Sequence, residues 1–153
     1  MKLSKNFSLA EMTKSQTAIR KGIKNEPSTE HVENLIHLAK TVLQPIRDEF
    51  GRPVVISSGY RSPELCEAIG SSSKSQHAKG EAADFEIPGV DNMQLAMWIS
   101  KNTTFDQLIL EFYEPGDPNS GWVHCSAVKE GSRAQVLKAS KVEGKTKYEN
   151  ILL

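Results

Sequence analysis

Hydrophobic residues recur at helical spacing in one long stretch of the chain. Between residues 28 and 50 they fall on one face of a helix, at Val32, Leu35, Ile36, Ala39, Val42, Leu43 and Ile46. Ser28 is a suitable N-cap, and Gly51 followed by Pro53 ends the pattern. We therefore predict an amphipathic helix that packs on the core, with Pro45 kinking it or ending its regular part.

Four shorter segments have the β-branched or alternating composition of strands. They cover residues 54–58, 82–87, 105–112 and 122–128. A loop rich in Pro, Gly, Asp and Asn separates the last two, which are therefore predicted to pair as an antiparallel hairpin. A further strand around 134–138 is expected to close the edge of the sheet, before a polar tail from about residue 139.

Helices are expected to flank these strands. A short helix is predicted within residues 8–20, and another after Ser62, which can cap it with Pro63 at its first position. A third is expected after Asp91, which is a suitable N-cap. The order of elements predicts a single domain, residues 1–153, of the α+β class, with an antiparallel sheet flanked by helices.

The composition suits one globular domain with a core: 153 residues, 38% hydrophobic and 25% charged. Lys plus Arg equal Asp plus Glu at 19 each, which argues against nucleic-acid binding. No apolar run is long enough for a signal peptide or a membrane span, so we expect cytoplasmic synthesis and no membrane insertion. A monomer is expected. Cys66 and Cys125 are interpreted as small buried side chains rather than a disulfide framework.

Two histidines and a carboxylate form the candidate chemistry of the chain. His77 and Asp84 lie in the pattern S-x-H-x-x-G-x-A-x-D, and His124 follows in W-x-H. Zinc is held by such ligands, and three protein ligands leave a fourth position for water or substrate, which is typical of catalytic sites. His31 and His37 lie on the long helix with no ligand pattern around them, so they are expected to be surface residues.

These motifs, with the turn S-G-Y-R-S at residues 58–62, resemble the signature of the zinc D-alanyl-D-alanine peptidases. That family includes vancomycin-resistance D,D-dipeptidases and phage L-alanyl-D-glutamate endolysins. The resemblance runs from about residue 43 to His124. It implies a fold similar to the hedgehog and D,D-peptidase fold, a Zn²⁺ cofactor held by His77, Asp84 and His124, and a peptidoglycan stem peptide as substrate.

The resemblance also implies substrate contacts. Arg61 on the S-G-Y-R-S turn would bind the substrate or stabilise the negative charge of the transition state. Ser75, just before the first histidine of the motif, would help to position the substrate. Trp122 is interpreted either as a substrate contact or as an aromatic residue of the pocket wall or core.

The general base departs from the family pattern. Many members carry a glutamate three residues before the final histidine, where this chain has Gly121. We predict Glu111 in this role, because strand alternation and the hairpin turn it toward the same site as His124. Glu114 and Asp117, in the intervening loop, are the next candidates.

The predicted function is a zinc metallopeptidase, a carboxypeptidase or endopeptidase, that cuts a D-Ala-D-Ala or L-Ala-D-Glu bond. A phage endolysin or virion-associated lysin is the favoured setting, reaching the cell wall through a holin or as part of a virion. A cytoplasmic D,D-dipeptidase is the nearest enzymatic rival. The alternative of another class is a hedgehog-like zinc-containing module that binds cell wall or builds a phage structure, with weak or no catalysis.

Overall fold

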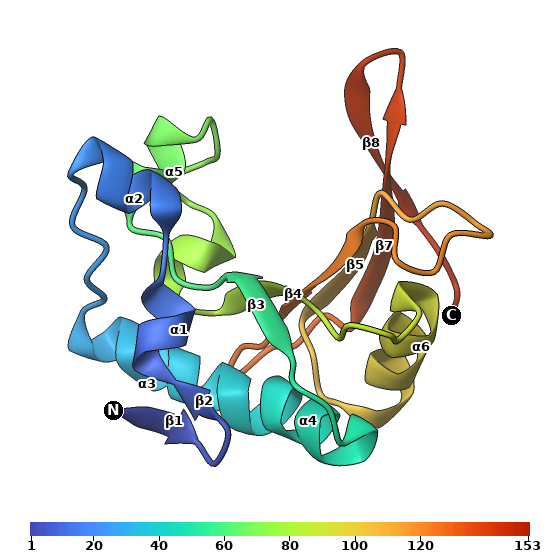
Figure 1. The fold of residues 1–153 in the computed structure, drawn as a ribbon, viewed down its shortest axis with the longest axis horizontal. Coiled ribbons are helices and arrows are strands. Elements are labelled where there is room, and N and C mark those ends of the chain that lie inside the picture. Colours follow the sequence, from blue (N-terminus) through green and yellow to red (C-terminus); the bar gives the residue numbers. More distant parts are fainter.

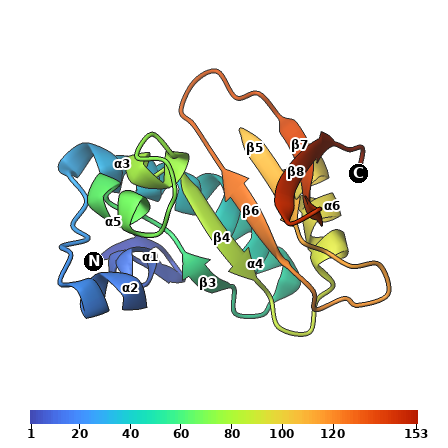
Figure 2. The ribbon, with the colours of Figure 1, turned by 90° about the horizontal axis from the view of Figure 1, so that it is seen from above.

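A six-stranded sheet forms the centre of the protein. In the computed structural model, which describes all residues 1–153, the strands lie in the order β3-β4-β6-β5-β7-β8. Their bounds are β3 Val55–Ser58, β4 Ala82–Glu86, β5 Gln107–Glu111, β6 Trp122–Ser126, β7 Gln135–Val142 and β8 Lys145–Asn150. Helices α3 (Thr29–Leu38), α4 (Gln44–Phe50) and α6 (Asn92–Asn102) lie behind one face of this sheet (Figures 1 and 2).

The sheet is mixed rather than wholly antiparallel. The predicted β5–β6 hairpin is confirmed, and four of the five pairings in the sheet are antiparallel. The expectation of an antiparallel sheet is wrong at the pair β5–β7, which is parallel. The connection at residues 127–134 reverses the chain after β6, so β7 runs antiparallel to β6 and therefore parallel to β5, which lies between them.

The residues from about 139 onward are not an irregular tail. They complete β7 and form β8, which pairs with it antiparallel with Ala139 opposite Tyr148. Strand β8 is polar and exposed throughout, as its composition indicates. Pairing with β7 provides hydrogen-bond partners for about half of the backbone N–H and C=O groups of β8. Lysines on the exposed edge strand discourage pairing with another sheet.

The long helix is interrupted just before Pro45, as predicted. Helix α3 continues into the π-helical turn η1 (Ala39–Leu43) and then into α4. Proline has no N–H to donate to the preceding turn, and a widened turn accommodates this loss. The Ser28 hydroxyl accepts from the backbone N–H of His31, and Gly51 ends the helix in the left-handed conformation.

The remaining elements are short. At the N-terminus lie β1 (Lys2–Ser4), β2 (Phe7–Ser8), α1 (Leu9–Thr13) and α2 (Gln16–Lys21). The single helix expected within 8–20 is thus two, because Ser15 caps a new start. Ser62 caps α5 (Pro63–Ala68) and Asp91 caps α6, as predicted. No helix has the length and apolar character needed to cross a membrane.

Alternation along the strands gives the sheet two different faces. The core contains alternate residues of the central strands, namely Ala83, Phe85, Leu108, Leu110, Val123 and Cys125, all turned toward the helices. The residues between them, among them Asp84, Ile109 and His124, line a cleft on the other face. The fold therefore buries one face against helices and leaves the other available for chemistry.

Candidate metal centre and active site

His77, Asp84 and His124 come together in this cleft. One ligand atom from each lies within 4.8 Å of the others. His124 Nδ1 is 2.9 Å from Asp84 Oδ1, and His77 Nε2 is 3.5 Å from the same oxygen. Ligand atoms around a tetrahedral zinc ion lie about 3.4 Å apart, given bonds of about 2.1 Å. The spacing and chemistry of the three donors fit one divalent metal ion.

A short 3₁₀ turn, η2 (Gln76–Lys79), holds His77. The Ser75 hydroxyl caps this turn by accepting from the backbone N–H of His77 at 3.1 Å. His77 Nδ1 lies 2.7 Å from the carbonyl oxygen of Gly59, to which it can donate. This contact favours the tautomer in which the lone pair of Nε2 faces Asp84, as a metal ligand requires.

Strand register places the other two candidate ligands together. Asp84 on β4 lies directly opposite His124 on β6. Burial alone would raise the pKa of Asp84, but hydrogen bonds with His124 and His77 outweigh it and hold the pKa well below its usual value. Burial lowers the pKa of His77, which favours the neutral imidazole. An ionised carboxylate beside a neutral imidazole is ready to bind a cation.

Glu111 lines the same cleft, which has a volume of about 300 Å³. Glu111 lies opposite Trp122, and Ile109 opposite His124, so both strands present these side chains to one face, as predicted. Burial raises the pKa of Glu111, and the neighbouring Asp84 carboxylate raises it further. A carboxylate with a raised pKa is a stronger proton acceptor. Glu114 and Asp117 do not line the cleft; they form an isolated bridge in the loop.

The backbone explains why glycine occupies position 121. Gly121 has φ +65°, and a Cβ there would overlap the carbonyl oxygen of Glu111 and lie 2.7 Å from the carbonyl carbon of Phe112. A glutamate side chain at this position therefore requires the loop to move away from the end of β5. The carboxylate of the cleft comes from the neighbouring strand instead.

The predicted substrate contacts also reach the cleft. Arg61, Ser75 and Trp122 all line it. Arg61 Nε and Trp122 Nε1 are buried nitrogens without a hydrogen-bond partner in the protein. Because buried donors are normally paired, these two are available to a ligand. The Ser75 oxygen already accepts from the backbone N–H of His77, so it also helps to position His77.

Four residues of the cleft were not among the predicted site residues. Ser71, Gln107, Ile109 and Tyr148 complete the lining. Strand alternation accounts for Gln107 and Ile109, which share a face with Glu111. Tyr148 lies in the segment expected as a polar tail, and only the pairing of β8 with β7 brings it to the site.

A buried carboxylate, that of Asp106, holds η2 in place through a hydrogen bond from Gln76. Asp106 is only 3% exposed and accepts from the backbone N–H, Nε and Nη2 of Arg133 and from Nε2 of Gln76, at 2.7 to 3.0 Å. The hydrogen bond with Arg133 is the main reason why the pKa of Asp106 is lowered to about 2. Gln76 directly precedes His77, so this network ties the turn that carries His77 to the start of β5.

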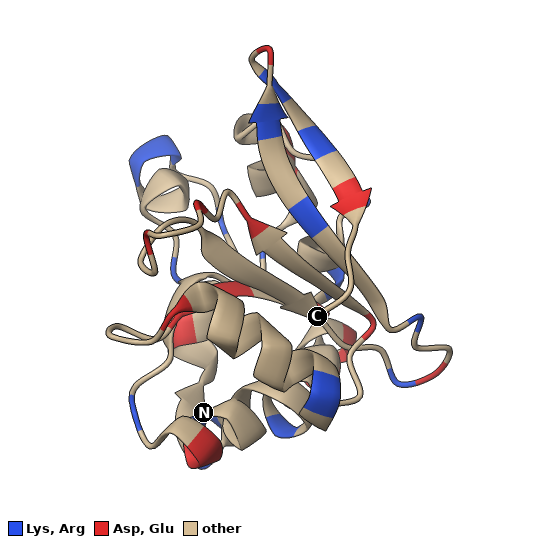
Figure 3. Cartoon of the chain, turned by 90° about the vertical axis from the view of Figure 1, so that its right-hand side faces the viewer, with Lys and Arg blue, Asp and Glu red and all other residues tan.

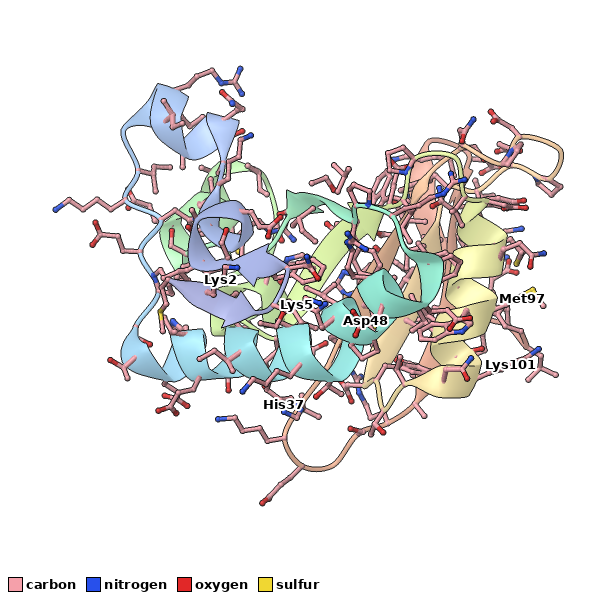
Figure 4. All side chains as sticks on the ribbon, turned by 60° about the horizontal axis from the view of Figure 1, so that its bottom comes forward. Lys2, Lys5, His37, Asp48, Met97 and Lys101 are labelled. Carbon is pink, nitrogen blue, oxygen red and sulfur yellow. The ribbon has the colours of Figure 1, made fainter.

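The other histidines lie outside the site, as expected, but they are half-buried rather than surface residues. His37 Nε2 is 3.2 Å from the carbonyl oxygen of Val128, on the face formed by the helices (Figure 4). His31 closes the helix cap with Ser28 and lies 5.3 Å from the Tyr60 ring, centroid to centroid. Both cysteines are free and buried, in agreement with the sequence interpretation.

An α+β fold with a His-Asp-His cluster and a further carboxylate in one cleft defines the class of metal-dependent hydrolases. The comparison with protein families agrees. The chain belongs to the Peptidase M15 family, whose model matches residues 5–126. The family is one of metallopeptidases, and the fold is hedgehog/D,D-peptidase-like, which confirms the resemblance read from the motifs. A comparison with curated proteins gives no match.

Proposed function

We propose that the protein is a zinc metallopeptidase that hydrolyses an amide bond of peptidoglycan stem peptides, of the D-Ala-D-Ala or L-Ala-D-Glu type. The observation that carries the proposal is the convergence of His77, Asp84 and His124 within 4.8 Å, in the cleft that Glu111 also lines. Membership of the Peptidase M15 family supports amide hydrolysis as the reaction. Access to the wall through a holin or a virion is part of the proposal.

The protein side chains divide the work of hydrolysis. His77 Nε2, Asp84 and His124 Nδ1 would hold the zinc ion, which when bound supplies Lewis-acid catalysis. Glu111 takes a proton from the attacking water at its carboxylate and passes it to the leaving amine nitrogen. Its raised pKa suits both transfers.

Arg61 supplies a fixed positive charge at the edge of the same cleft. Its buried, unpartnered Nε can donate to a carboxylate of the substrate or to the oxygen on which negative charge develops. Trp122, opposite Glu111 on the hairpin, can donate its indole N–H to a substrate carbonyl. These donors orient the peptide relative to Glu111.

The test compares zinc content and turnover in the same preparations. Release of new amino termini and of free D-alanine is measured from purified peptidoglycan and from D-alanyl-D-alanine, with and without added zinc. The variants are His77→Ala, expected to lose both zinc and turnover, and Glu111→Gln, expected to keep zinc and lose at least about 100-fold in kcat. Zinc binding without turnover of either substrate by the wild type would refute catalysis and support a binding module.

A further inference from the structure

The C-terminal hairpin contributes Tyr148 to the lining of the cleft, although it lies outside the family match, which ends at residue 126. Tyr148 of β8 lines the cleft together with Arg61 and Ser75. In Figure 1 the hairpin rises on one side of the open sheet face and α5, next to Arg61, rises on the other. The cleft is thus completed by a segment that the family model does not cover.

Strand register directs Tyr148 into the site. Trp122, Glu111, Ala139 and Tyr148 form one row across β6, β5, β7 and β8, each residue opposite the next. Residues in such a row project from the same face of a sheet. Ala139, fully buried, is the only side chain between Glu111 and Tyr148, and its small size leaves room for the phenol to lean toward the cleft.

The phenol is free to bind a ligand. The Tyr148 side chain is 55% exposed, and its hydroxyl takes part in no hydrogen bond of the protein. Burial, followed by the nearby Glu111 and Asp84 carboxylates, raises the pKa of Tyr148. The hydroxyl therefore stays protonated at neutral pH and can donate to a carbonyl or carboxylate oxygen.

The hairpin carries one lysine, Lys141, on the same face as Tyr148, and its other lysines project from the opposite face. Its 16 residues, 135–150, include four lysines and two glutamates (Figure 3). Lys141 lies two residues beyond Ala139 on β7, with Nζ 3.4 Å from Thr146 Oγ1 and 5.7 Å from the centre of the Phe112 ring. Protection of an edge strand explains the outward lysines, but it does not explain why Tyr148 and Lys141 face the cleft side.

We propose that this face of the hairpin, with Tyr148 and Lys141, binds a carboxylate-bearing part of the peptide substrate that extends beyond the dipeptide at the metal centre. Tyr148 is then a specificity-determining residue. Lys141 lies about 7 Å farther along the sheet than the row of Glu111, and β7 is about 5 Å from β5. A dipeptide is about 7 Å long, so a ligand that contacts both the metal centre and Lys141 must be longer. The identity of the peptide rests on the proposed function.

The test compares a stem pentapeptide, L-Ala-D-Glu-L-Lys-D-Ala-D-Ala, with D-Ala-D-Ala. Tyr148→Phe removes only the hydroxyl, so KM for the pentapeptide should rise about fivefold to tenfold while kcat stays within about twofold. Lys141→Gln should raise the same KM about threefold, and less at high salt. Lys147→Gln, on the opposite face of β8, is the matched control and should change neither substrate's kinetics. Values for the dipeptide should be unchanged in all three variants.

Affinity measured by calorimetry separates this proposal from the proposed function. If the wild type binds the pentapeptide without cutting it, the peptidase proposal fails. The hairpin proposal then still predicts a fivefold to tenfold weaker affinity for the pentapeptide in Tyr148→Phe. An equal effect of Tyr148→Phe on both substrates, or none on the pentapeptide, overturns the hairpin proposal alone. Absence of pentapeptide binding by the zinc-loaded wild type overturns both.

Discussion

Substitution of Gly121 should destabilise the protein more than its left-handed conformation alone accounts for. An alanine at φ +65° costs about 1–2 kcal/mol in any setting. Here the new Cβ also meets backbone atoms of Glu111 and Phe112, which cannot rotate away as side chains do. Overpacking of this kind costs about 1–3 kcal/mol more. We expect Gly121→Ala to lower the free energy of unfolding by about 3 kcal/mol.

Gly22→Ala is the matched control for this experiment. Gly22 has the same φ of +65°, but no atom lies within 4 Å of the position of its Cβ. Its substitution should therefore cost only the conformational part, about 1–2 kcal/mol. Urea unfolding measures both differences. In a domain of this size, 3 kcal/mol corresponds to a Tm about 6–12 °C lower. If the two variants lose the same free energy of unfolding within about 0.5 kcal/mol, the close approach of Gly121 to Glu111 does not contribute to stability.

The same contact predicts the result of restoring the family spacing. Gly121→Glu places a glutamate three residues before His124, but only by displacing the backbone of Glu111, which we propose as the general base. Turnover of stem peptides should fall below that of the wild type, with zinc content retained. A gain in kcat would show that the loop accommodates the side chain and that position 121 can supply the base.

Three further predictions address the support, the metal and the thiols. Asp106→Asn should lower the free energy of unfolding by about 3 kcal/mol at pH 7, at the lower end of the range for a broken buried pair because Arg133 is half-exposed. The folded-state pKa of Asp106, about 2, lies below the ordinary aspartate value of 3.8, so this stabilisation is present above pH 4 and lost as the pH falls toward 2. The free energies of unfolding of the two proteins, measured in urea, should therefore converge near pH 2. Zinc at 100 times its Kd should stabilise the wild type by about 2.7 kcal/mol, or about 5–11 °C in Tm, and should not shift the Tm of His124→Ala. Burial raises the pKa of Cys125 and, to a smaller extent, that of Cys66, so a thiol reagent should label neither before unfolding in urea; rapid labelling of native protein would contradict their burial.

Local rules sufficed for much of the fold. The caps at Ser28, Ser62 and Asp91, the break before Pro45 and the β5–β6 hairpin were all predictable, because each depends on residues close together in the chain. Rules of this kind fail where the partner is remote. The parallel β5–β7 pair and the strand β8 could not be predicted, since a polar segment of low hydrophobicity takes its structure from the strand it pairs with.

The sequence by itself indicated the three candidate metal ligands, through motifs that resemble those of the family, and the face of the hairpin that carries Glu111, through strand alternation. Tertiary structure decided what surrounds them. The carbonyl of Gly59 that orients His77, the backbone contact that requires Gly121, and the arrival of Tyr148 at the cleft each join segments brought together only by folding. Such contacts depend on strand register and packing, which result from many weak interactions over the whole chain. They therefore cannot be predicted from the residue type at any single position.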